Sequence, residues 1–174
     1  MESLTFFIYS FVSVFTIVNP VSGLVTFISL TEGMDNTERK RTVVRSVVIA
    51  CTLAIIFAAS GDLILRFFGV TVDCLRVAGG ILLFVIALNM LQAQTSRESV
   101  TMEEIKDAGK RNDVSVFPIA MPVLTGPGAI TTVIILIRSG TTIWLKALVL
   151  GAVLFTFVLT YIIFSFADKI DKIL

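Results

Sequence analysis

Long apolar stretches separated by short polar segments dominate this sequence. A helix needs roughly 20 apolar residues to cross the hydrocarbon core of a bilayer, and five stretches are long enough. They cover residues 4–30, 43–65, 72–91, 114–137 and 143–167. The pattern therefore predicts an all-α, polytopic helical membrane protein with five spans. Spacing typical of a capping box also predicts a helix start near Asn36 and a short surface helix near Thr101.

Proline interrupts the first and the fourth stretch. Asn19-Pro20 breaks the first, and Gly126-Pro127-Gly128 breaks the fourth. Proline removes a backbone donor and clashes with the preceding turn, so neither stretch is expected to be one continuous helix. In lipid, the freed backbone groups need partners within the protein or in a water-filled cavity. Both breaks are therefore expected to face the inside of the molecule.

The residues at the two breaks have the chemistry of helix starts. Asparagine is a preferred N-cap and proline is tolerated in the first helical position, so a half-helix should begin at Pro20 after Asn19. Gly126 and Pro127 can play the same parts for a half-helix that runs on to Ile137. Each N-terminus presents N–H groups that suit a carboxylate, and each preceding half ends in carbonyls that suit an ammonium group. A zwitterionic amino acid can thus be held without a charged side chain.

The broken helices occupy corresponding places in two units of the chain. Three spans separate the start of one unit from the start of the next, so the units insert in opposite directions. Interrupted spans at matching places of inverted repeats point to the binding site of a transporter. Residues 1–91 are expected to form the first three-helix repeat, residues 92–113 a cytoplasmic linker, and residues 114–174 a second, inverted and incomplete repeat. A sixth span is expected beyond residue 174, in a longer native product.

Composition agrees with a membrane protein and excludes several other classes. The chain is 56% hydrophobic, only 16% charged, and has a mean hydropathy of +0.95. No basic run with interleaved aromatic residues indicates nucleic-acid binding. The sequence has no histidine, and its two cysteines lie in or beside apolar stretches, so neither a metal site nor a cofactor is expected. An enzyme would need a catalytic dyad that this sequence does not offer.

Two carboxylates lie near the ends of predicted spans. Asp62 is four residues from Arg66, and Asp73 is three residues from Arg76. Side chains at these spacings share a helix face, which favours interfacial ion pairs with arginines that extend towards water. The alternative makes Asp62 or Asp73 a carboxylate that couples transport to protons.

Four segments carry a family resemblance: Asn19-Pro20 with Gly23, residues 68–69 with 78–83, residues 87–91, and residues 118–132. On these segments the chain resembles the MarC family of integral membrane proteins, which includes the SnatA-type transporters of small neutral amino acids. The resemblance implies six transmembrane helices in two inverted three-helix units. It also implies transport, often export, of small neutral amino acids such as glycine and alanine.

The predicted substrate site joins the two breaks, where glycines leave room for a small ligand and hydroxyl groups add contacts. Its residues are Thr16, Asn19, Pro20, Ser22, Gly23, Thr125, Gly126, Pro127, Gly128 and Thr131. The protein is expected to be a secondary transporter that works by alternating access. A small-solute channel and a non-transporting membrane subunit are the alternatives, and in the latter the breaks are only kinks. The expected partners are a small neutral amino acid and the lipid bilayer, and self-association is left open.

The distribution of Lys and Arg predicts the orientation in the cytoplasmic membrane. With five alternating spans, ten of these side chains fall on one side and four on the other. The richer side should be cytoplasmic, which places the N-terminus outside. Cysteines introduced at Asn36 and Glu104 should be protected from an impermeant thiol reagent added outside, whereas those at Glu2 and Gly140 should react. The opposite labelling pattern would reverse the predicted orientation.

Overall fold

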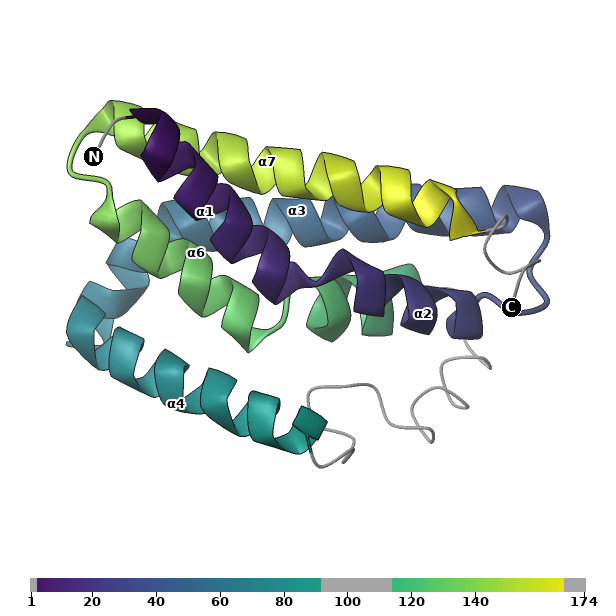
Figure 1. Ribbon diagram of the computed structural model, residues 1–174, viewed down its shortest axis with the longest axis horizontal. Helices are drawn as coiled ribbons and strands as arrows, with labels where there is room; N and C mark the ends of the chain where they lie inside the picture. Colours follow the sequence, from purple (N-terminus) through teal and green to yellow (C-terminus); the bar gives the residue numbers. More distant parts are fainter. Residues whose placement is uncertain (1–2, 92–113, 168–174) are drawn as a thin grey trace.

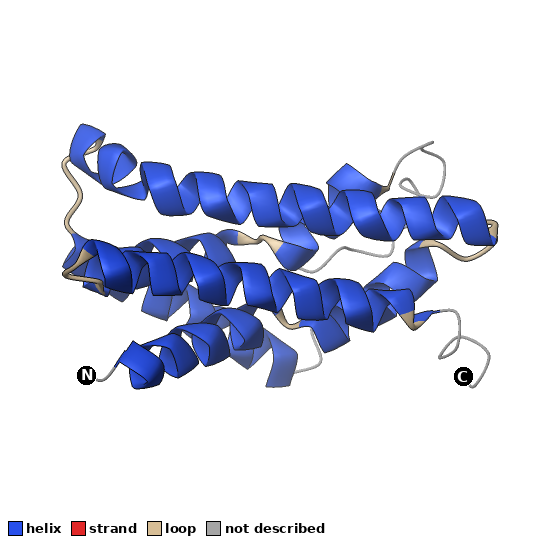
Figure 2. Cartoon of the chain, turned by 90° about the horizontal axis from the view of Figure 1, so that it is seen from above, coloured by secondary structure: helices blue, strands red, loops and turns tan. Residues whose placement is uncertain are grey.

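The computed structural model describes residues 3–91 and 114–167, and in these ranges helices follow one another with short connections (Figures 1 and 2). The elements are α1 (Ser3–Val18), α2 (Pro20–Leu30), α3 (Asn36–Phe67), α4 (Val72–Leu91), the π-helical segment η1 (Ser115–Leu124), α6 (Pro127–Ser139) and α7 (Ile143–Ser165). No strand occurs in the described ranges, as the sequence predicts. The helix predicted near Thr101 and the other expectations for residues 92–113 lie outside the described residues.

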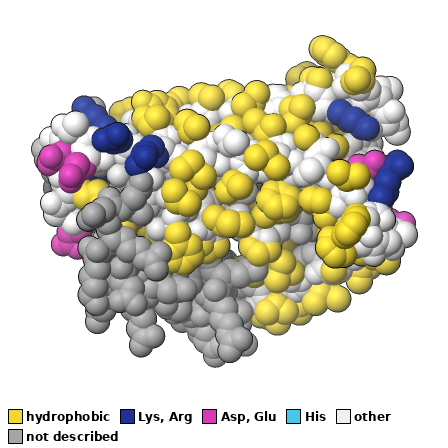
Figure 3. Space-filling view, turned by 180° about the vertical axis from the view of Figure 1, so that it is seen from behind, with side chains coloured by type: hydrophobic (Ala, Val, Ile, Leu, Met, Phe, Trp, Pro, Cys, Tyr) yellow, Lys and Arg dark blue, Asp and Glu magenta, His cyan; other side chains and the backbone are white. Residues whose placement is uncertain are grey.

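The lengths and the composition of the helices are those of a multi-pass membrane protein. Three helical stretches in the described ranges are long and apolar enough to cross a bilayer: α1 together with α2, α3, and α7. The pair of η1 and α6, bent by 57° at its break, is a fourth if the two halves form one span. Helix α4, with 20 residues, occupies the place of the predicted third span, and its crossing of the membrane stays a prediction. In Figure 3, apolar side chains cover the middle of the visible face, and charged ones gather at its two ends.

Helices α1, α3, α6 and α7 form the body of the molecule. Helix α7 packs against α1 and α3, while α6 contacts α1, α3, α4 and α7 (Figure 1). Helix α4 packs mainly on α6 and leaves apolar side chains such as Ile81 and Phe84 exposed. Small residues on α3, among them Ala50 and Ala54, are buried in the core and let neighbouring helices approach closely. As a result, α6 is the helix that connects α4 to the rest of the bundle.

Helix α3 begins at Asn36, the residue that the sequence predicts. Asp35 caps it, because its carboxylate accepts hydrogen bonds from the backbone N–H groups of Thr37 at 2.7 Å and Glu38 at 2.8 Å. In the next turn, Arg39 is buried and donates from Nε to Thr31 Oγ1 at 3.0 Å. This bond joins the end of α2 to the start of α3.

Two glycines give α6 its close contacts with α3 and α4. A Cβ atom on Gly61 of α3 would lie 2.7 Å from Cγ1 of Ile134. A Cβ atom on Gly79 of α4 would lie 2.4 Å from Cγ2 of Thr131. A methyl group would fit at neither contact unless the facing side chain moved, so both positions favour glycine. The neighbouring Gly80 is exposed, and a Cβ atom there would meet nothing within 4 Å.

The adjacent glycines of α4 provide a matched test of this packing. Gly79→Ala is expected to lower the free energy of unfolding by about 1–3 kcal/mol, the usual cost of overpacking a tight contact. Gly80→Ala should change it by less than about 1 kcal/mol, and in the stabilising direction, because alanine is the better helix former. Thermal unfolding of the two variants in detergent measures the difference. Equal shifts in the two melting temperatures would show that α4 does not pack on α6 through Gly79.

Candidate functional site

The first break lies between α1 and α2, at the position predicted from sequence. Asn19 is the N-cap of α2, its side-chain Oδ1 accepts a hydrogen bond from the backbone N–H of Ser22 at 3.3 Å, and Pro20 is in the first turn. The cap and the half-helix start are therefore confirmed. Asn19 has a φ of 46°, in the left-handed region that asparagine tolerates better than most residues. That conformation was not predicted from the sequence.

The second break lies between η1 and α6. Gly126 is the N-cap of α6 and Pro127 occupies its first turn, as predicted, but no side chain caps this helix. The half before the break is irregular, because Phe117 and Met121 have non-helical backbone angles within η1. Each of these residues precedes a proline through a cis peptide bond. The chain thus has two helix starts of unequal chemistry, one with a side-chain cap and one without.

The fold brings the two breaks into contact. A Cβ atom on Gly128, in the first turn of α6, would lie 3.5 Å from Cγ2 of Ile17, near the end of α1. A Cβ atom on Gly23, in the first turn of α2, would lie 3.3 Å from Cδ2 of Leu124, at the end of η1. Each half-helix start therefore touches the end of the half that precedes the other break. Leu83 of α4 closes over Gly128, with its Cδ2 2.9 Å from the position of that Cβ.

Thr125 ties the second break to α3. Its side chain is fully buried, and its hydroxyl donates a hydrogen bond to the carbonyl oxygen of Ala50 at 3.0 Å. The two residues are 75 positions apart in the chain. Because the hydroxyl hydrogen points to α3, Thr125 can offer a ligand only the lone pairs of its oxygen.

The predicted site residues divide into buried and exposed groups. Gly23, Thr125 and Gly128 are buried where the breaks meet, and Thr131 is half-buried against Gly79 of α4. The others form the border of the contact: Pro20 is buried, Gly126 is half-buried, and Thr16, Asn19, Ser22 and Pro127 are exposed. The structure thus brings the residues of both breaks together, and it places the Thr131 side chain at the interface between α4 and α6.

A cavity of about 280 Å³ lies elsewhere, between the start of α3 and the end of α7. Its lining combines basic, hydroxyl and apolar side chains: Arg39, Lys40, Val43, Val44, Tyr161, Phe164, Ser165 and Ala167. Phe164 belongs to this cavity and also reaches the first break, since its ring atom Cζ would be 3.3 Å from a Cβ on Gly23. This cavity was not predicted from the sequence, because its lining comes from residues far apart in the chain.

The two carboxylates considered for coupling form the predicted ion pairs. Asp62 contacts Arg66 at 3.1 Å, and Asp73 contacts Arg76 at 3.0 Å. Asp62 also pairs with Arg138 of α6, which the sequence did not indicate. Arg138 lies eleven residues beyond Pro127, so a rise of about 1.5 Å per residue places it roughly 16 Å from the break. Asp62 is therefore too remote to touch a ligand held at the breaks.

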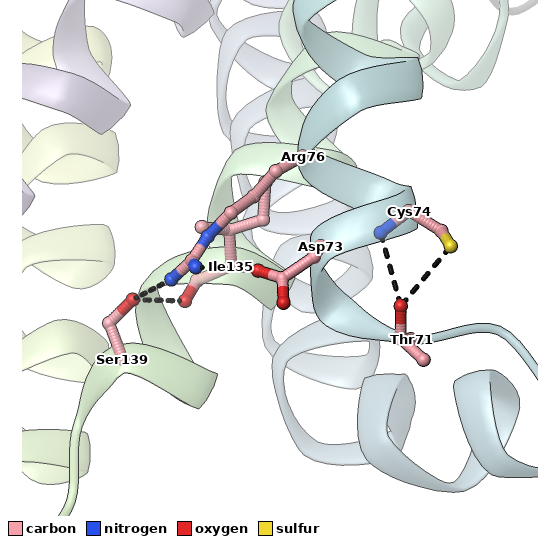
Figure 4. A network of polar contacts seen from close by, with 6 residues as sticks. All are labelled: Thr71, Asp73, Cys74, Arg76, Ile135 and Ser139. Atoms are coloured by element: carbon pink, nitrogen blue, oxygen red, sulfur yellow. Dashed lines mark hydrogen bonds and ion pairs between the residues drawn. The ribbon is translucent and has the colours of Figure 1, made fainter.

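The second of these pairs also reaches α6. Arg76 donates from Nη2 to Ser139 Oγ at 3.3 Å, while the Ser139 hydroxyl donates to the carbonyl oxygen of Ile135 at 2.9 Å (Figure 4). Asp73 and Arg76 belong to α4, and Ser139 is the last residue of α6. The end of α6 is thus linked by polar contacts to both α3 and α4.

Comparison with known proteins gives a consistent result. Residues 4–174 match a family described as MarC family integral membrane protein. A UPF0056 membrane protein of Methanocaldococcus jannaschii is 35% identical over 171 residues, which cover 98% of this chain and 83% of the relative. UPF0056 membrane protein YvbG of Bacillus subtilis is 33% identical over 169 residues, which cover 97% of this chain and 80% of the relative. No solved structure matches the chain.

Substitutions of Asn19 separate its two contributions to the first break. Asn19→Ala is expected to lower the free energy of unfolding by about 2 kcal/mol, about 1 from the lost cap and about 1 from the left-handed backbone. Asn19→Gly should cost only about a few tenths of a kcal/mol, since glycine caps adequately and tolerates a positive φ. Thermal unfolding in detergent checks the order. If alanine were tolerated as well as glycine, the left-handed turn at Asn19 would be wrong.

Proposed function

This chain belongs to the MarC family of integral membrane proteins, and from that premise we propose that it is a secondary transporter of small neutral amino acids such as glycine and alanine. The observation that carries the proposal is the contact between the two helix breaks, through Gly128 with Ile17 and Gly23 with Leu124. Broken helices that meet inside a membrane protein place helix N-termini and free carbonyl groups at one point. In this proposal the chain carries inverted three-helix repeats, five spans and an outside N-terminus.

The first turn of α6 is the place for the substrate carboxylate. No side chain caps this helix, so the N–H groups of Gly128 and Ala129 are left to a ligand, Pro127 having none. The start of α2 differs, because the Asn19 side chain already accepts from Ser22. Backbone N–H groups and the positive end of the helix dipole favour an anion at α6 without any basic side chain.

Carbonyl groups before the breaks supply acceptors for the ammonium group. The carbonyl oxygen of Thr16 would normally bond the N–H group four residues later, but that residue is Pro20. The Val123 carbonyl lacks a following helical turn for another reason, because the chain leaves the helical conformation at Thr125 and Gly126. These two carbonyls precede the two breaks, so a bound zwitterion can face N–H groups at one end and carbonyl oxygens at the other.

The packing around the breaks favours a small substrate. Leu83 and Ile17 enclose Gly128, and Leu124 and Phe164 enclose Gly23, each with an atom within 3.5 Å of the place that a Cβ atom on the glycine would take. Glycine and alanine add little beyond a backbone-sized group and therefore need the least displacement of these side chains. Alternating access would move them apart on one side of the membrane at a time.

Counterflow in liposomes tests the proposed function. Liposomes that contain the purified full-length protein are loaded with unlabelled glycine or alanine. They should accumulate the labelled amino acid transiently and in a saturable way. A small-solute channel would give flux that does not saturate and no counterflow. Absence of flux with a panel of small neutral amino acids would contradict the proposal and favour a non-transporting membrane subunit.

A matched pair of glycine substitutions tests the location of the site. Gly128→Ala adds a methyl group 2.9 Å from Leu83 Cδ2, where the substrate is proposed to bind, and should raise the half-saturation concentration for glycine by about tenfold. Gly151→Ala is the control, since its Cβ would meet Phe7 Cε2 at an ordinary 3.8 Å. Its transport should match that of the unmodified protein. Equal transport by the two folded variants would contradict a substrate site at the breaks.

A further inference from the structure

Helix α6 connects the proposed substrate site to a polar cluster at its other end. It starts at Pro127, next to the contact between the breaks, and ends at Ser139. At that end, Arg138 pairs with Asp62 of α3, and Ser139 accepts from Arg76 of α4. A 13-residue helix is a rigid rod of about 18 Å, so displacement of one end changes the position of the other.

Between its two ends, α6 contacts α3 and α4 at glycine residues. Ile134 lies against Gly61 of α3, and Thr131 lies against Gly79 of α4. Glycine offers no side chain at these points, so α6 lies close to both helices there through apolar contacts alone. The contacts of Arg138 with α3 and of Ser139 with α4 add polar links at the end of α6.

The pair between Asp62 and Arg138 can open without leaving a carboxylate unpaired. The two side chains are 40% and 37% exposed, although the Asp62 oxygen Oδ1 that faces Arg138 is itself buried. Asp62 keeps a second partner in Arg66 on its own helix, at 3.1 Å. An ion pair between partly exposed side chains contributes little to stability, which suits a contact that must form and break repeatedly.

We propose that α6 is a gate that closes against α3, and that the ion pair between Asp62 and Arg138 is the latch that keeps it closed. While closed, it holds the end of α6 against α3 and shuts the breaks off from the side of the membrane where Asp62 lies, which is predicted to be the outside. When it opens, α6 tilts about its contact with Gly61 and exposes its first turn to that side. Asp62 is thus a positioning residue rather than a group that touches the substrate. The proposal rests on the transport function proposed above.

A reporter cysteine measures the gate without any substrate. In full-length protein in which Cys51 and Cys74 are replaced by serine, Ala129→Cys places a thiol in the first turn of α6, where Ala129 is 5% exposed. An impermeant thiol reagent is added on the side where Asp62 lies, and the rate of modification is followed. Arg138→Gln should raise this rate about fivefold, the shift in population expected for loss of one such ion pair.

The control is Arg66→Gln, which removes a cation from the same carboxylate but from within α3. Its labelling rate should equal that of the parent, and Arg138→Lys should restore most of the closed state. Asp62→Asn breaks the same link from its other side and should also accelerate labelling. Equal acceleration by Arg66→Gln and Arg138→Gln, or none by Arg138→Gln and Asp62→Asn, would overturn the latch.

This readout separates the two proposals. Accelerated labelling by Arg138→Gln with no amino acid counterflow in the parent would keep the gate and reject the proposed substrate. Counterflow in the parent with unchanged labelling of all variants would keep the transporter and reject the latch.

Discussion

A backbone carbonyl that loses its helical partner inside a bilayer finds no water to replace it, and this chain loses such partners at two places. Pro20 has no N–H group to offer Thr16, and after Val123 the chain leaves the helical conformation at Thr125 and Gly126. Because lipid cannot compensate, both breaks must lie against protein or an internal cavity. The packing follows from that requirement, since the ends of α1 and η1 meet the starts of α6 and α2, and Thr125 bonds the second break to α3.

Small residues let the other helices close around this contact. Gly61 and Gly79 bring α3 and α4 onto α6, and Gly23 admits Leu124 and Phe164. The ion pairs of Asp62 and Asp73 lie at the ends of helices, away from the two breaks. The breaks are thus surrounded mainly by apolar and small residues, while ion pairs link the ends of α3, α4 and α6.

Local chemistry was enough to predict the helix starts and the positions of both breaks. Asp35 caps α3, Asn19 caps α2, and Gly126 precedes α6, because each signal is contained within a few residues. Contacts between distant residues were not predictable in this way. Nothing near Thr125 in the sequence indicates Ala50, and nothing near Asp62 indicates Arg138. The left-handed turn at Asn19 was not predicted either, whereas the extended backbone of Phe117 and Met121 has a local cause, since each residue precedes a proline.

The different caps of α2 and α6 bear on the orientation in which a zwitterion could bind between the breaks. At the start of α2, the Asn19 amide oxygen already occupies the place that an anion would take, while the start of α6 has no such internal occupant. A scaffold with two similar breaks would accept a zwitterion in either of two antiparallel orientations. Here one of those orientations would place the carboxylate at the start of α2, where the Asn19 side chain already accepts a hydrogen bond from Ser22. One asparagine side chain at the first break can therefore decide which end of a zwitterion faces which break.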